Sequence, residues 1–147
     1  MYLLDTNHCS RIIFGEPALI EQLQLHSEAG VATSVIVRGE LFYMAAKSER
    51  TAANLQQIRA FLDTIDLYPI NLPISEVYGA LKGKIITAFG PKDKTQRRNF
   101  NPQSLGFGDN DLWIAATAIH YNLTVVSSDN DFQRIQQVES FALESWV

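Results

Sequence analysis

The chain has 147 residues, the length of one domain with a single hydrophobic core. Apolar residues make up 46% of it and charged residues 19%, values that exclude a mainly disordered or a collagen-like chain. Twelve Lys and Arg against sixteen Asp and Glu give a net charge of −4, which excludes a uniformly basic coat for nucleic acid.

The first half of the chain alternates short apolar runs with helix-like segments. Asp5-Thr6-Asn7 and Ser34 are residues typical of helix starts, and each follows an apolar run. Pro69 places the third apolar run at the edge of a sheet. In chain order, this half predicts a strand at 2–4, helices at 7–14 and 18–25, a strand at 31–34, helices at 35–47 and 51–65, and a strand at 67–70.

The second half continues this alternation after one interruption. A helix is predicted at 74–88, and then residues 89–108 lose all apolar periodicity and contain several Gly and Pro, which predicts a long loop. Asp109-Asn110-Asp111 is a strong helix start. From there the sequence predicts a helix to residue 121, a strand at 124–127, a helix at 129–138 and a last strand at 141–143.

Alternating strands and helices predict the fold class and the domain organisation. The pattern is typical of an α/β protein with a mostly parallel central sheet and helices on both faces. No repeat or low-complexity tract divides the chain, so one domain is expected over 1–147.

The only cysteine, Cys9, cannot close an internal disulfide or form a cysteine-based zinc site. A reducing, cytoplasmic location is therefore expected. Asp5 interrupts the first apolar run before a signal peptide could form, and no window has the roughly 18 apolar residues that a membrane span needs.

Basic charge is concentrated in one segment. Residues 82–98 hold six basic side chains and one acid, a local charge of +5, against −9 for the rest of the chain. A solvated helix end and loop is one interpretation, and contact with a phosphate backbone is the other. The basic residues of the predicted loop are Lys92, Lys94, Arg97 and Arg98.

Acidic residues follow several of the predicted strands. Each has an ordinary alternative: Asp5 and Asp111 as helix caps or first-turn acids, Glu40 as an exposed helical charge and Asp129 as a turn residue. Their positions relative to the predicted strands nevertheless place all four at the carboxyl-end edge of the sheet, which is where ligands bind in open parallel sheets. Neighbouring carboxylates repel one another, and a divalent cation relieves this repulsion. Oxygen-only ligands favour Mg²⁺, with Mn²⁺ as the alternative, and metal-assisted phosphodiester hydrolysis is the chemistry that follows.

Four blocks of the sequence resemble the PIN-domain ribonucleases, in particular the VapC-like toxins of type II toxin-antitoxin pairs. The blocks span nearly the whole chain: Leu3-Leu4-Asp5-Thr6-Asn7, Glu40-Leu41, Asn110-Asp111-Leu112-Trp113-Ile114-Ala115-Ala116 and Ser127-Ser128-Asp129-Asn130-Asp131-Phe132. The resemblance implies a Mg²⁺-dependent endoribonuclease that acts on RNA, often tRNA. It also implies a cognate antitoxin as partner and a homodimer. No membrane association is expected, because the chain has no apolar run of the required length.

The resemblance implies roles for matching residues. Asp5, Glu40 and Asp111 are expected to bind metal and to be catalytic. Asp129 is expected as the fourth acid, with Asp131 as second choice. The hydroxyls of Thr6, Ser10 and Ser127 could position water or phosphate, although helix capping explains them first. Lys92, Lys94, Arg97 and Arg98 would hold the RNA backbone.

Two departures from the family and two competing functions stay open. Residues 89–108 are longer than this family usually has before its third acid, and Asp109 adds a carboxylate that we interpret as a helix cap. Phosphatases of the haloacid-dehalogenase type also have an Asp after their first strand, and the resemblance to them is the alternative. Their motif at this point is Asp-x-Asp, whereas this chain has Asn7 in place of the second acid. An inactive module that binds RNA or an antitoxin is the non-enzymatic alternative.

Overall fold

Five short strands form one parallel sheet in the centre of the molecule. The computed structural model describes residues 1–147. The strands lie in the order β3-β2-β1-β4-β5, and every neighbouring pair is parallel. Because the strand order reverses between β1 and β4, a crevice is expected at the carboxyl ends of these two strands. The strands are β1 (Tyr2–Leu4), β2 (Val31–Ser34), β3 (Asp66–Tyr68), β4 (Thr124–Val126) and β5 (Ala142–Glu144).

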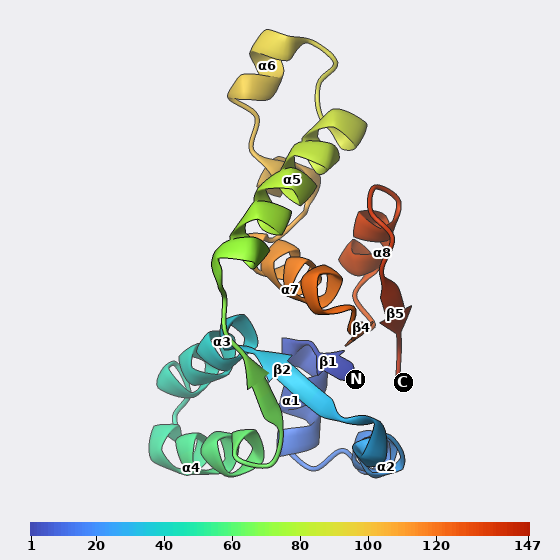
Figure 1. Cartoon of the computed structure of the whole chain (residues 1–147). Helices are drawn as coiled ribbons and strands as arrows, with labels where there is room; N and C mark the ends of the chain where they lie inside the picture. Colours follow the sequence, from blue (N-terminus) through green and yellow to red (C-terminus); the bar gives the residue numbers. More distant parts are fainter.

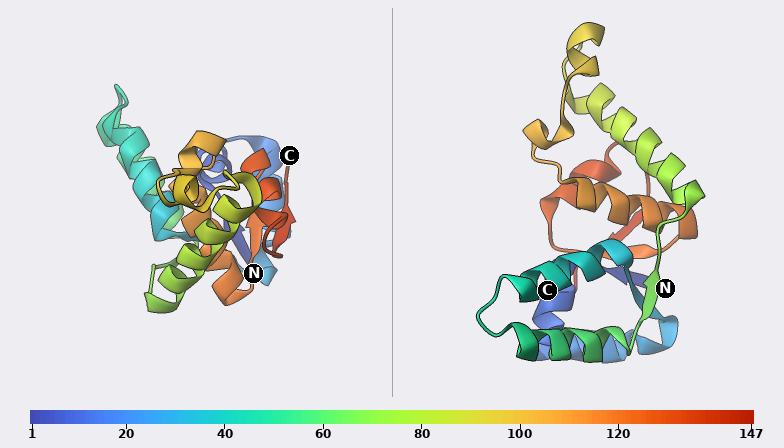
Figure 2. Two further views of the ribbon diagram at one scale, coloured as in Figure 1. Left: turned by 90° about the horizontal axis from the view of Figure 1, so that it is seen from above. Right: turned by 90° about the vertical axis from the view of Figure 1, so that its left-hand side faces the viewer.

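Helices cover both faces of the sheet. In Figures 1 and 2, α1, α2 and α4 lie on one side, and α5, α7 and α8 lie on the other. The predicted α/β architecture is thus confirmed, with a sheet that is parallel throughout. The helices are α1 (Thr6–Ile13), α2 (Pro17–Leu25), α3 (Val35–Ala46), α4 (Thr51–Leu62), α5 (Leu72–Phe89), α6 (Lys94–Arg98), α7 (Asp109–Tyr121) and α8 (Asn130–Gln136), with 3₁₀ turns η1 (Ser27–Ala29) and η2 (Pro102–Leu105).

The central strands explain why the sheet is buried on both faces. Leu3, Leu4, Val125 and Val126 have no exposed surface, so β1 and β4 are apolar on either side, as expected for strands covered twice. Strand β3 is an edge strand, as Pro69 predicts. No helix of the chain combines the length and the apolar character needed to cross a membrane.

The prediction of a continuous loop at 89–108 is wrong in part, because this segment contains α6 and η2. The Asp93 carboxylate accepts hydrogen bonds from the backbone N–H groups of Thr95 and Gln96, and the Asn101 side chain accepts one from Gln103 N–H. These caps are sufficient to start single helical turns. Helix α6 buries no residue, so it leaves no apolar periodicity in the sequence.

Helix α6 lies at the tip of a projection. Helix α5 packs along α7 and continues beyond it, and the chain forms α6 before it returns through η2. Figure 1 and the right-hand view of Figure 2 show α6 at the far end of α5, away from the sheet.

Candidate active site

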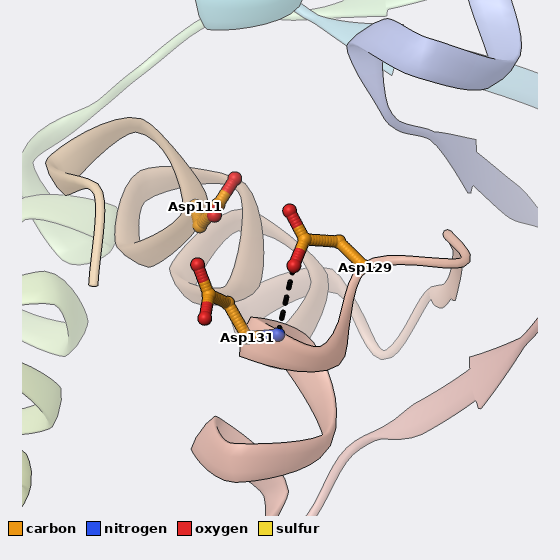
Figure 3. Close-up of side chains that lie close together, drawn as sticks. All are labelled: Asp111, Asp129 and Asp131. Carbon is orange, nitrogen blue, oxygen red and sulfur yellow. Dashed lines mark hydrogen bonds between the residues drawn. The ribbon is translucent and has the colours of Figure 1, made fainter. Parts of the chain in front are cut away.

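Five carboxylates gather near the carboxyl ends of β1 and β4. Asp5 follows β1 directly, Glu40 comes from α3, Asp111 from the first turn of α7, and Asp129 and Asp131 from the start of α8. Carboxylate oxygens of Asp111, Asp129 and Asp131 lie within 4.8 Å of one another (Figure 3). The charges of Asp5 and Glu40 also act on Asp111. The structure therefore brings together the four acids predicted from sequence, together with Asp131.

Asp111 carries the electrostatic consequence of this crowding. Partial burial, followed by repulsion from Asp129, Asp131, Glu40 and Asp5, raises the pKa of Asp111 from 3.8 to about 7. No Lys or Arg forms an ion pair with Asp111. The carboxylates thus form an oxygen-only donor set with too little positive charge around it, which fits a hard divalent cation.

Asp5 has two roles at once. Its Oδ1 accepts hydrogen bonds from the backbone N–H of His8 at 2.8 Å and from His8 Nδ1 at 2.9 Å, which caps α1. The His8 ring is fully buried, so it holds the carboxylate in one orientation. Oδ2 of Asp5 has no hydrogen bond within the protein and is free for a ligand. The cap and the acid cluster are therefore compatible interpretations of Asp5.

Two of the three predicted hydroxyls contact the acids. Thr6 Oγ1 donates to Glu40 Oε1 at 2.9 Å and so links α1 to α3. Ser127 is buried, and its Oγ accepts a hydrogen bond from Asp129 N–H at 3.0 Å, which shapes the turn after β4. Ser10 makes no side-chain hydrogen bond to the acids. Helix capping, the first explanation for these hydroxyls, is wrong for all three. Thr6 and Ser10 lie within α1, whose N-cap is Asp5, and Asp129 rather than Ser127 is the N-cap of α8.

Asp129 and Asp131 are both placed to serve as the fourth acid. Asp129 is exposed, and its carboxylate caps α8 by accepting from Asp131 N–H at 2.9 Å. Burial, then the charge of Asp129, raises the pKa of Asp131, whereas Arg134, 3.6 Å away, lowers it. Asp131 is thus partly neutralised within the protein, which leaves Asp129 as the freer ligand.

The interpretation of Asp109 as a helix cap is wrong. Gly108 occupies the N-cap position of α7, and Asp109 is the first residue within the helix. Its carboxylate accepts hydrogen bonds from Lys82 Nζ at 3.1 Å and from Tyr78 Oη at 2.9 Å. The Lys82 bond, and then the Tyr78 bond, lower the pKa of Asp109. Asp109 fastens α7 to α5 and is satisfied outside the acid cluster.

The basic segment divides into two parts. Lys82 pairs with Asp109 and Lys84 with Glu139, so these two cations serve packing. The other four form no ion pair and lie apart from the acids, on the projection in Figure 1. They are Lys92, Lys94, Arg97 and Arg98, of which Arg97 is half-buried and the rest are exposed.

A groove beside the acids was missed by the sequence analysis. It has a volume of about 580 Å³ and runs along α3 from Thr6 and Glu40 towards Tyr43 and Lys47, with Asn110 of α7 also lining it. Residues 40, 43 and 47 share one face of α3 by helical spacing, which is the sequence signal that could have found this groove. A second pocket is lined by Asp5, Asn7, Arg11, Ser128 and Asp129.

Comparison with known proteins gives one family match. The model of the PIN domain matches residues 2–138. A curated relative, "Ribonuclease VapC2" of Rickettsia felis, is 28% identical over 99% of this chain and 98% of its own length, and "Ribonuclease VapC2" of Haemophilus influenzae is 27% identical with the same coverage.

Solved structures share the fold over the whole chain. The VapBC2 complex of Rickettsia felis, bound to a DNA fragment from its promoter, contains a chain that superimposes with a TM-score of 0.78 at 27% identity and covers 99% of this chain and 98% of that chain. The DNA-bound VapBC of Salmonella typhimurium has a TM-score of 0.79 at 22% identity with the same coverage, a likeness of fold alone.

Proposed function

The chain belongs to the PIN-domain family, and from this we propose that it is a Mg²⁺-dependent endoribonuclease, the toxin of a toxin-antitoxin pair. The observation that carries the proposal is the convergence of Asp5, Glu40, Asp111 and Asp129 on one sheet edge, with the pKa of Asp111 raised to about 7. Relatives named as VapC ribonucleases, aligned over almost the full chain, support the choice of RNA as substrate.

The four acids would hold the cation, with Mn²⁺ as an alternative to Mg²⁺. A divalent cation in such a site supplies a bound water that ionises near neutral pH, and charge stabilisation at a phosphate. The protein's own part is orientation: His8 fixes Asp5, Thr6 fixes Glu40, and the turn from Ser127 to Asp129 fixes the fourth acid. Such preorganisation avoids rearrangement during the reaction.

The four basic residues at the tip of the projection, which we call the basic tip, are proposed to contact the RNA backbone. Replacing Lys92, Lys94, Arg97 and Arg98 together by Gln should weaken RNA binding and lower the slope of log affinity against log salt by about 3, because each phosphate contact to a single strand contributes about 0.7. Filter binding at several salt concentrations measures the slope. Replacing Arg50 and Arg59, at α4 on the other side of the sheet, is the control. An unchanged slope in the tip variant would contradict the contact.

Partners follow from the same premise. We propose that the chain binds a cognate antitoxin, which is supported by the solved relative described as a VapBC2 complex. We also propose that it forms a homodimer. A structured RNA such as tRNA is the finer proposal for the substrate. Co-expression with a candidate antitoxin should restore growth to cells in which expression of this chain arrests growth.

RNA-end mapping in cells that express the chain tests the activity directly. New 5′-phosphate ends should appear at a defined position in one RNA class, and the purified protein should produce the same ends with Mg²⁺ and lose this activity with EDTA. Turnover of small phosphomonoesters with intact RNA would instead favour the haloacid-dehalogenase-type phosphatase. Binding of RNA or antitoxin without any cleavage would favour the inactive module.

A further inference from the structure

The groove along α3 combines an aromatic face, a free cation and an amide next to the acids. Tyr43 is 66% exposed, so its ring is accessible to a ligand in the groove. Lys47 Nζ lies 5.0 Å from the centre of the Tyr43 ring and forms no ion pair. Asn110, beside Asp111 in sequence, lines the groove from α7.

We propose that this groove is a nucleotide subsite, in which Tyr43 stacks on the base next to the cleaved phosphodiester and Lys47 binds the following phosphate. The proposal rests on the nuclease function above and adds a position that selects the substrate. Stacking on an aromatic ring accepts any base, whereas the Asn110 amide can donate to and accept from a base edge. The groove therefore favours single-stranded RNA, whose bases are free to turn outward.

Helical geometry connects the groove to the acids. Tyr43 lies about 4.5 Å and Lys47 about 10 Å along the axis of α3 from Glu40, at 1.5 Å per residue, and all three line one groove. A strand whose phosphate lies at the acids thus meets first an aromatic ring and then a cation. The pocket that Asp5 and Asp129 line offers less, because its cation, Arg11, is already paired with Glu16 through two hydrogen bonds.

Gly39 is a position at which a substitution can block the groove. It lines the groove, and a Cβ added there would meet no atom within 4 Å. A large side chain at this position should therefore fill the subsite without disturbing the core. Gly83 of α5 is a matched control, since it is also helical and open to added atoms but lies outside the groove.

The test uses an oligoribonucleotide that contains the mapped cleavage position, with and without the base next to the cleaved bond. Tyr43→Leu, Lys47→Gln and Gly39→Phe should each lower kcat/KM on the intact RNA on the order of tenfold, the scale of one lost stack or phosphate contact. Tyr43→Phe, which keeps the aromatic ring, should retain more activity than Tyr43→Leu. Gly83→Phe, which lies outside the groove, should stay within about twofold of the wild type. On the RNA that lacks the base, kcat/KM of the wild type should fall to about the value that Tyr43→Leu has on the intact RNA. The kcat/KM of Tyr43→Leu should be the same on both RNAs.

Several outcomes would overturn the proposal. If Tyr43→Leu and Gly39→Phe kept the wild-type kcat/KM, the proposed subsite would be refuted, and the nuclease function would stand. Loss of antitoxin binding in these variants, with cleavage unchanged, would assign the groove to the protein partner instead. A wild-type protein that cuts no RNA would overturn the nuclease function, and the subsite with it.

Discussion

Asp5→Asn and Asp111→Asn should each lower RNA cleavage on the order of a thousandfold or more. Each substitution removes one negative ligand from an oxygen-only donor set and leaves the shape of the side chain almost unchanged. The cation and its bound water supply several kcal/mol of the barrier reduction, and each 1.36 kcal/mol lost costs a factor of ten in rate. Single-turnover cleavage of the mapped RNA, with Mg²⁺ in excess, measures the loss.

Asp109→Asn is the matched control for Asp111→Asn. It is the same chemical change two residues away in the same turn of α7, but Asp109 is bonded to Tyr78 and Lys82 rather than directed into the acid cluster. Its cleavage rate should stay within a fewfold of the wild type. Full activity in Asp111→Asn, or an equal loss in Asp109→Asn, would show that metal binding by Asp111 is not what the reaction needs.

The framework of the site follows from the sequence because its elements are locally encoded. Asp5 follows an apolar strand, and β4 is followed within three residues by Asp129. Parallel strands bring such positions to one edge whatever the details of packing. The sequence therefore predicts which acids meet, and the fold class predicts where.

Partners of individual side chains could not be predicted in this way. In the sequence, Asp109 resembles a helix cap. In the structure, the packing of α5 against α7 places Lys82 Nζ 3.1 Å from its carboxylate. The contact of Thr6 with Glu40 joins residues 34 apart in sequence, and no local pattern encodes it. Both depend on how helices pack across the sheet, which short-range spacing does not specify.

The basic segment shows the same limit in another form. Counting charges over residues 82–98 groups six cations together. In the structure, two of them lie within the long helix α5, and the other four lie beyond its end. Lys82 and Lys84 are paired near the body, and the others lie at the tip. The loop expected between them has short capped helices, because caps stabilise a turn without any apolar face.

Without metal, Asp111→Asn should make the folded protein more stable at pH 8, although it abolishes cleavage. The pKa of Asp111 is raised to about 7 by burial and neighbouring carboxylates, against 3.8 as its ordinary value. A raised carboxyl pKa means that the folded state binds this proton more tightly than the unfolded state does. The stability that the proton provides is present in full below about pH 4 and is lost as the pH rises through about 7.

Thermal unfolding in EDTA measures this effect. Asp111→Asn should raise Tm by several degrees at pH 8, the scale of one to a few kcal/mol in a domain of this size, and by much less at pH 4.5. Asp109→Asn should change Tm in the opposite direction at pH 8, because the pKa of Asp109 is lowered by Lys82. Added Mg²⁺ should stabilise the wild type more than Asp111→Asn, since only a state that binds the ion gains from it. A wild-type protein whose Tm exceeds that of Asp111→Asn at pH 8 without metal would mean that the carboxylates do not repel one another in the fold, and the physical reason for a cation at this site would be lost.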